Sequence, residues 1–274
     1  MTFLHARVVT VVAVFGLVSA ACDAPHRYPE LPLEELQRLA EQGDATAQLN
    51  LGLKHAIGEG VLQDDAEAVR WYRLAADQGD ASAQSILGFN YDTGRGVPED
   101  DAEAVRWYRL AADQGDAGAQ FTLGLNYDTG RGVPEDDAEA ARLYRLAADQ
   151  GNALAQNNLG TMYSFGGGVP QDQAEAVRWY RLAADQGLAV AQYYLGVMYN
   201  TGLGVPQDAA EAVRWYRLAA DQGDAGAQFT LGLNYDTGRG VPEDDAEAAR
   251  LYRLAADQGG RPRAGQPRGH VRQW

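Results

Sequence analysis

Apolar and polar positions along the chain follow a pattern that repeats every 36 residues. The segment EAVRWYRLAADQG occurs four times and returns twice with two changes, as EAARLYRLAADQG. Its copies stand at 67–79, 103–115, 139–151, 175–187, 211–223 and 247–259. Residues 116–151 and 224–259 are identical at all 36 positions. A fixed period of this size is typical of a solenoid, in which each repeat buries its apolar face against its neighbours.

Within one repeat, apolar residues recur twice at helical spacing. In residues 116–151, Asp116 has the residue type of a helix N-cap. One stripe then consists of Ala119, Leu123, Gly124 and Tyr127. A second stripe consists of Ala140, Tyr144, Ala147 and Ala148. Each repeat is therefore predicted to be a helical hairpin.

The segment GRGVPEDD separates the two predicted helices. Gly130 and Gly132 can end the first helix with a positive φ, and Pro134 suits the first turn of the second helix. The acidic residues that follow the proline are expected to complement the positive end of the helix dipole.

The repeated residues resemble the Sel1-like repeat, a relative of the tetratricopeptide repeat. The shared pattern is A-x-A-Q-x-x-L-G-x-x-Y-x-x-G-x-G-V-P-x-D-x-A-E-A-x-R-x-Y-R-x-A-A-D-Q-G. The resemblance implies an all-α fold, a right-handed α-solenoid of helical hairpins that binds proteins. It covers residues 44–259 as six repeats, and residues 33–43 resemble the second helix of a preceding half repeat. The six repeats are 44–79, 80–115, 116–151, 152–187, 188–223 and 224–259.

Two positions in each repeat predict tight packing. A tyrosine recurs in every second helix, and a buried aromatic ring contributes roughly 4–6 kcal/mol before ordering costs. A glycine follows the leucine of the first helix, where it costs about 1 kcal/mol relative to alanine. We expect this glycine to mark a close approach between helices. The glycines after the first repeat are Gly88, Gly124, Gly160, Gly196 and Gly232.

The first helices carry the residues that differ among repeats. The variable positions fall on the side opposite the fixed positions, and the first helix lines the concave surface in solenoids of helical hairpins. We therefore predict a partner-binding groove that is rich in aromatic residues and methionine. Packing against a neighbouring repeat is the alternative role for these side chains. The predicted groove residues are Phe121, Leu125, Leu154, Met162, Phe165, Val190, Tyr193, Tyr194, Val197, Met198 and Phe229.

The two ends of the chain differ from the repeats. Residues 1–21 contain an apolar run from Val8 to Val18 that is too short to span a bilayer, so a signal peptide is predicted. Cys22, the only cysteine, stands where a bacterial lipoprotein signal places its lipidated residue, and ordinary cleavage after Ala20 or Ala21 is the alternative. Residues 22–32 read as a tether, and residues 260–274 as a disordered basic tail.

The charge of the repeats argues against nucleic-acid binding. All 38 acidic residues lie in residues 22–259, which hold 18 of the 23 basic residues and so carry a net charge of −20. Such a surface repels phosphate backbones and anionic lipid headgroups. Contact with a membrane is expected only through the N-terminal lipid anchor.

The candidate chemical motifs have simpler explanations. Asp-Thr-Gly, at 92–94, 128–130 and 236–238, spells the aspartic-protease triplet, but it ends a predicted helix and leads into a glycine turn. The acidic run after the proline could hold a cation only loosely. The four histidines form no shared site with the single cysteine. We therefore predict no catalytic residues, no metal site and no cofactor.

The sequence favours a scaffold in the bacterial cell envelope that binds a protein or peptide in its groove. The alternative is an envelope protein that engages peptidoglycan or β-lactams. Relatives of that kind are described as having a disulfide in each repeat, which a chain with one cysteine does not allow. The oligomeric state does not follow from the sequence.

Overall fold

The computed structural model describes residues 31–260, and all regular secondary structure in this part of the chain is α-helical. The predicted signal peptide, the lipidation site Cys22, nearly all of the tether and the basic tail lie outside the described residues. The helices are α2 (Leu33–Glu41), α3 (Ala45–Ile57), α4 (Asp65–Asp77), α5 (Ala81–Thr93), α6 (Asp101–Asp113), α7 (Ala117–Thr129), α8 (Asp137–Asp149), α9 (Ala153–Phe165), α10 (Gln173–Asp185), α11 (Ala189–Thr201), α12 (Ala209–Asp221), α13 (Ala225–Asp236) and α14 (Asp245–Gly260).

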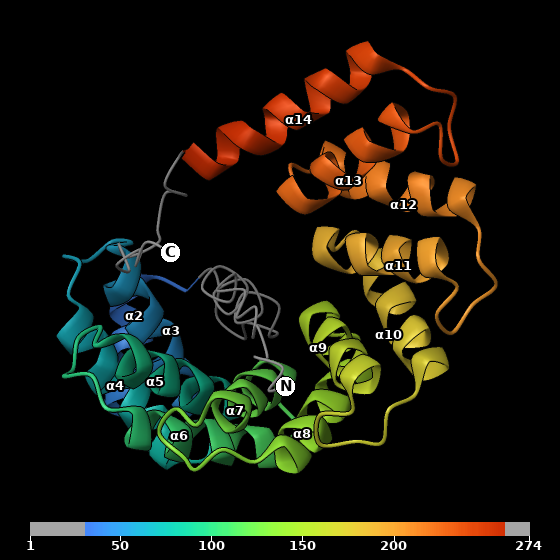
Figure 1. The fold of residues 1–274 in the computed structure, drawn as a ribbon. Helices are drawn as coiled ribbons and strands as arrows, with labels where there is room; N and C mark the ends of the chain where they lie inside the picture. Colours follow the sequence, from blue (N-terminus) through green and yellow to red (C-terminus); the bar gives the residue numbers. More distant parts are fainter. Residues whose placement is uncertain (1–30, 261–274) are drawn as a thin grey trace. The chain divides into compact units, whose positions relative to one another are not determined.

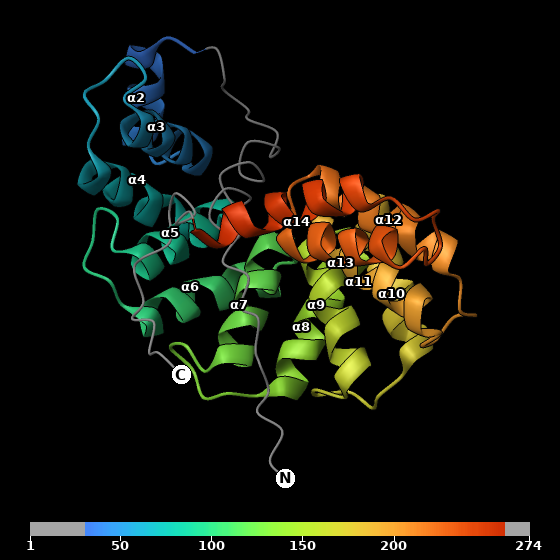
Figure 2. The same ribbon diagram turned by 45° about the horizontal axis from the view of Figure 1, so that its top comes forward.

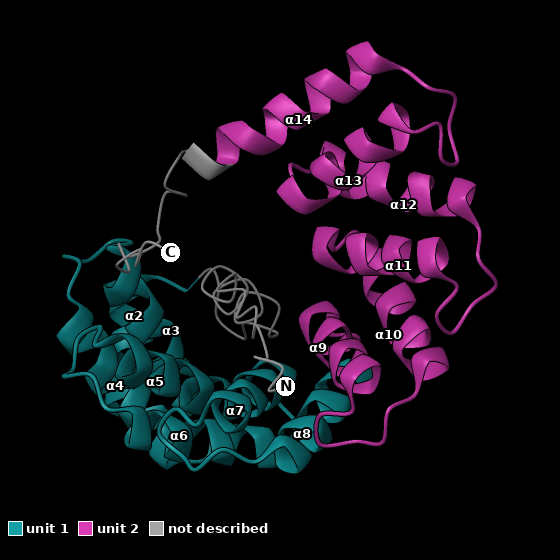
Figure 3. Ribbon diagram, viewed as in Figure 1, with its two compact units in different colours: residues 1–150 teal, residues 151–274 magenta. Residues whose placement is uncertain are grey.

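The helices form two compact units that divide between Gln150 and Gly151 (Figure 3). We call them the N-terminal unit and the C-terminal unit. Within each unit, every helix packs against the helix before it and the helix after it. The hairpins therefore stack in sequence order as a solenoid, which confirms the predicted all-α architecture.

Each hairpin contributes one helix to each of two layers. Within the N-terminal unit, α3, α5 and α7 form the inner layer, and α4, α6 and α8 form the outer layer (Figures 1 and 2). Within the C-terminal unit, α9, α11 and α13 form the inner layer. The inner layer contains the first helix of each repeat, where the sequences vary.

The sequence sets the limits of each helix locally. The carboxylate of Asp116 accepts a hydrogen bond from the backbone N–H of Ala119 at the start of α7, and Gly130 ends that helix with φ 71°. Asp136 caps α8, and one of its oxygens accepts bonds from two backbone N–H groups. The prediction that Pro134 lies in the first turn of the second helix was wrong. The proline lies in the loop, because the aspartate two residues later satisfies the helix terminus.

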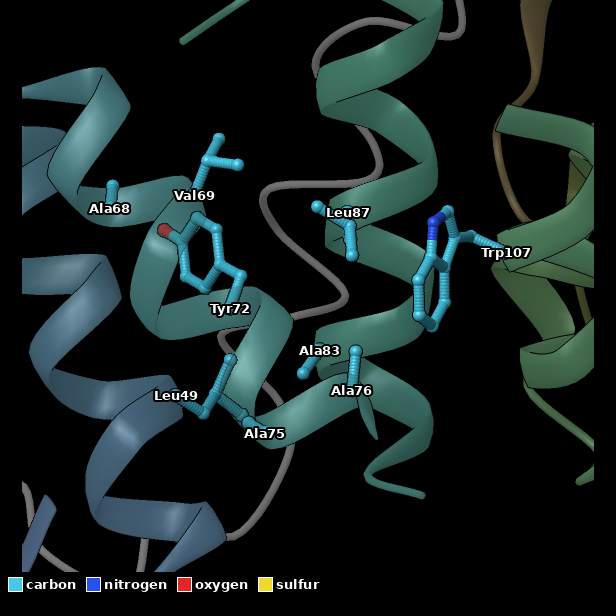
Figure 4. Packing of buried hydrophobic residues seen from close by; sticks show 9 residues of the cluster. All are labelled: Leu49, Ala68, Val69, Tyr72, Ala75, Ala76, Ala83, Leu87 and Trp107. Atoms are coloured by element: carbon cyan, nitrogen blue, oxygen red, sulfur yellow. The ribbon is translucent and has the colours of Figure 1, made fainter. Parts of the chain in front are cut away.

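The core consists of small residues and aromatic rings shared between successive hairpins. Around Tyr72 of α4, Ala68, Val69, Ala75 and Ala76 from the same helix meet Ala83 and Leu87 of α5 (Figure 4). Leu49 of α3 and Trp107 of α6 complete this cluster. The corresponding tyrosines of the next four repeats are buried in the same way: Tyr108, Tyr144, Tyr180 and Tyr216.

The predicted close approach at the helical glycine is confirmed. A Cβ atom on Gly160 would lie 2.9 Å from Cδ1 and Cε1 of the Tyr180 ring. Real Cβ atoms essentially never come this close to another heavy atom, so a side chain at this position would displace the tyrosine. The tyrosine and the glycine are therefore a matched pair, in which the ring of the second helix rests on the backbone of the first.

A buried glutamine joins each hairpin to the one before it and also bonds to a second glutamine of its own repeat. The side chain of Gln84 is 4% exposed, and its Nε2 donates to the carbonyl oxygen of Ala76 in the preceding repeat at 3.0 Å. Its Oε1 accepts from Nε2 of Gln114 at 2.8 Å. The same Gln–Gln bond recurs in all six repeats. These bonds satisfy a buried amide that would otherwise destabilise the stack.

Candidate functional site

The structure distributes the eleven predicted groove residues over three environments. Two are exposed, namely Phe165 at 72% and Phe229 at 57%. Six are half-buried: Leu125, Leu154, Val190, Tyr193, Tyr194 and Val197. Three are buried: Phe121 at 8%, Met162 at 7% and Met198 at 3%. The half-buried and exposed residues are the ones that a partner could contact without a rearrangement of the core.

The three buried residues belong to the packed interior. Met198 lies in a cluster with Leu195 and Trp215, and the ring of Phe121 lies 5.9 Å from that of Tyr144. The sequence placed these side chains on the variable stripe, but variation among repeats does not require exposure.

The half-buried tyrosines of α11 belong to a connected aromatic cluster. The ring of Tyr194 stacks on that of Tyr180 with a centroid distance of 5.3 Å. Tyr193 lies 5.6 Å from Tyr194 and 5.8 Å from Tyr216. Burial raises the pKa of the Tyr194 hydroxyl, and the neighbouring Tyr193 adds to the effect. We call these four residues the tyrosine cluster.

The tyrosine cluster couples a surface to the core. Tyr180 and Tyr216 are 1% and 0% exposed, whereas Tyr193 and Tyr194 remain partly accessible. Aromatic rings that rest on a rigid base lose little conformational entropy when they bind, and tyrosine is enriched at the centres of protein interfaces. Within the described residues, only the repeat 188–223 has two successive tyrosines in its first helix.

A pocket of about 360 Å³ lies in the C-terminal unit, lined by residues of α11, of α13 and of the loop that follows α13. It was not predicted from the sequence. Its lining is polar apart from one leucine, and a comparison of equivalent positions in the repeats could have found it. The lining residues are Asn200, Thr230, Leu233, Asn234, Thr237 and Arg239.

The Asp-Thr-Gly triplets lie at helix ends, as predicted. α5 ends at Thr93, Gly94 follows with φ 69°, and Asp92 pairs with the guanidinium of Arg131 at 2.9 Å. In the part of the chain that the structure describes, no three His, Cys, Asp or Glu side chains gather closely enough to hold a metal ion. No described helix is both long and apolar enough to cross a membrane.

Comparisons with known proteins agree with this arrangement. The family model for the Sel1 repeat matches residues 45–80, 81–116, 117–152, 153–188, 189–224 and 225–260. These repeats begin one residue later than the predicted ones. No curated protein matches the chain significantly.

Two solved structures are similar over most of the chain. One is a protective antigen of uropathogenic Escherichia coli strains with an SLR fold, at 41% identity and a TM-score of 0.80. The match covers 84% of this chain and 49% of the antigen, so the chain spans about half the length of that protein. The other is a Sel1 repeat protein from Oxalobacter formigenes, at 32% identity and a TM-score of 0.73, with 85% of this chain and 93% of that protein covered. The stacked hairpins, the six matched repeats and these two structures show that the chain belongs to the Sel1 repeat family.

Proposed function

We propose that the protein is a non-catalytic scaffold of the bacterial cell envelope that binds a protein or peptide on the inner layer of its C-terminal unit. Repeats of the Sel1 and tetratricopeptide type generally mediate protein–protein interaction. The envelope location is proposed from the N-terminal sequence, where an apolar run precedes Cys22.

The tyrosine cluster is the observation on which the binding surface rests. Tyr193 and Tyr194 are held by ring contacts to buried tyrosines and still expose part of their surface. Leu154 and Val190, on α9 and α11, are also half-buried and add apolar area. A rigid aromatic anchor with apolar neighbours is typical of the residues that dominate binding energy at protein interfaces.

The test is capture of a partner by the full chain in a bacterial cell. We expect chemical crosslinking and mass spectrometry to recover a protein with the wild type but not with the double variant Tyr193→Ala/Tyr194→Ala. The exposed Leu182 of α10, on the outer layer, provides the matched control, and Leu182→Ala should retain the partner. Recovery of the same proteins with all three chains would contradict the proposal.

A structural measurement must accompany this test, because Tyr194 stacks on the buried Tyr180. Each ring pair contributes about 0.5–1.5 kcal/mol. The double variant should therefore lose some thermal stability while its far-UV circular dichroism stays helical at the assay temperature. A loss of helicity at that temperature would show that these tyrosines belong to the core and would refute their assignment to the surface.

A further inference from the structure

Three of the repeats carry an arginine between the two glycines of the loop: Arg95, Arg131 and Arg239. Each guanidinium reaches back to the preceding repeat, where its Nη2 donates to a backbone carbonyl oxygen. The acceptor is Ala56 for Arg95 at 2.9 Å, and Asp92 for Arg131 at 2.8 Å. For Arg239 it is Asn200, at 2.9 Å. The three arginines therefore occupy the same place in the fold.

The arginines differ in the acidic groups around them. Arg131 is surrounded by three carboxylates of the preceding repeat. Its Nε donates to Asp101 at 2.8 Å, its Nη1 pairs with Asp92 at 2.9 Å, and its Nη2 pairs with Glu99 at 3.2 Å. Arg95 retains one such partner, Asp65, at 2.9 Å.

Arg239 has lost all three of these carboxylates. The equivalent positions in the preceding repeat are occupied by Asn200, Gln207 and Ala209, which carry no charge. Among the described residues, Arg239 makes no ion pair, although Asp236 and Glu243 are close to it in sequence. The guanidinium is thus held in place by a backbone hydrogen bond, while its charge has no ion-pair partner within residues 31–260.

Around Arg239, the pocket described above takes the place that carboxylates occupy around Arg131. Arg239 and Asn200 line it, together with Asn234, which is 4% exposed. Nδ2 of Asn234 and Oδ1 of Asn200 are both buried without a hydrogen-bond partner. Buried polar atoms are satisfied in the great majority of cases. The Asn234 amide and the Arg239 guanidinium, which has no ion pair among the described residues, therefore leave two donors in this pocket for a ligand or water.

We propose that this pocket binds the carboxylate of a peptide, with Arg239 as the charged donor and the Asn234 amide as a neutral one. A backbone N–H of the same peptide donates to Oδ1 of Asn200, because a carboxylate cannot donate to that acceptor. The proposal rests on the proposed function and specifies the chemistry of its partner. A carboxylate is favoured because carboxylates fill the same place around Arg131, where aspartate oxygens lie 2.8 Å and 2.9 Å from the guanidinium. Leu233, 45% exposed, offers an apolar contact for a neighbouring side chain of the peptide.

The first experiment titrates the full chain with three short peptides and follows the Nε–H resonance of Arg239 by NMR. One peptide carries a single glutamate with both ends blocked, the second carries glutamine in its place, and the third carries glutamine with a free C-terminal carboxylate. We expect the glutamate peptide or the free-acid peptide to shift the resonance, and the more effective of the two identifies the source of the carboxylate. The absence of a shift with both would overturn the proposal.

The second experiment gives Arg239 carboxylate partners from the protein itself. The double variant Asn200→Asp/Ala209→Asp restores to Arg239 the carboxylates that Asp92 and Asp101 give to Arg131. This variant keeps Arg239 and places at residues 200 and 209 the aspartates that already stand at the equivalent positions around Arg131. We expect peptide affinity to fall by about tenfold or more, as expected when a charge-assisted hydrogen bond is lost. Unchanged affinity in this variant would refute the site.

The third experiment uses Arg131 as the matched control. Arg131→Ala should leave peptide affinity unchanged, because its guanidinium is already occupied. The triple variant Asp92→Asn/Glu99→Gln/Asp101→Ala should make the Arg131 resonance sensitive to the carboxylate peptide, and a silent Arg131 there would contradict our reasoning. If the peptides fail but partner capture still requires Tyr193 and Tyr194, the carboxylate pocket alone is wrong and the proposed function stands.

Discussion

Phe121 and Phe229 permit a direct measurement of how much stacking stabilises a repeat, because they stand at the same position of two identical 36-residue repeats. Each ring contacts the tyrosine of its own repeat, at 5.9 Å for Phe121 and 5.5 Å for Phe229. Their exposure differs, at 8% against 57%. Local sequence and the contact within the repeat are therefore the same, and only the remaining surroundings differ.

The expected difference follows from the buried area. A phenylalanine buries about 150–250 Å² when fully covered. The gap in exposure is about half of the residue's surface, or about 100 Å². At about 25 cal/mol per Å², this area is worth about 2.5 kcal/mol. We expect Phe121→Ala to lower the free energy of unfolding by about 3–5 kcal/mol, and Phe229→Ala to lower it by about 1–2 kcal/mol.

The assay is urea denaturation of the full chain, followed by far-UV circular dichroism. Fraying of the last described repeat could also weaken the effect at Phe229, so a second matched pair is needed. Leu143 and Leu251 occupy the same position of the two repeats and are both 2% exposed. Leu143→Ala and Leu251→Ala should therefore have similar costs. Equal costs for the two phenylalanine variants, with equal costs for the two leucine variants, would refute the reasoning.

Three further predictions concern the packing of the repeats. Gly160→Leu should destabilise by at least about 1–3 kcal/mol, because the new Cβ would lie 2.9 Å from the Tyr180 ring; an unchanged melting temperature would contradict this. Burial raises the pKa of the Tyr180 hydroxyl above its ordinary value of 10.0, so unfolded tyrosine ionises first as pH rises. The stability that the neutral Tyr180 contributes should be fully present below about pH 10 and decline above it. The midpoint of urea unfolding should therefore be lower at about pH 11 than at about pH 8. Gln120→Ala removes the acceptor of Gln150 and the donor to Ala112, and should cost about 1–3 kcal/mol by thermal denaturation.

Much of the fold could be predicted from the repeats alone. The period of 36 residues gave the number of hairpins, and the aspartates and glycines marked helix ends that the structure confirms. The position of Pro134 was misjudged, because proline suits a first helical turn by residue type but α8 begins only at Asp137. Asp136 caps the helix, because its carboxylate accepts hydrogen bonds from two backbone N–H groups of the first turn.

The candidate site was only partly predictable. Tyr193 and Tyr194 stood out as variable and aromatic, and the structure leaves both partly accessible. Met198 also differs among the repeats, yet it is buried beside Trp215. A single helix cannot show how far its variable stripe extends under the neighbouring helices, and for that reason the sequence did not separate these residues.

The sequence by itself determined the hairpins, their order and the strong acidity of the repeats, because helix caps and apolar periodicity act within one repeat. Only the tertiary structure decided which identical residues are covered, as for Phe121 and Phe229. It also brought Arg239 beside Asn200 and Ala209, which stand 30 or more positions earlier in the chain. Burial and charge compensation depend on contacts between repeats, and such contacts exist only after the hairpins have stacked.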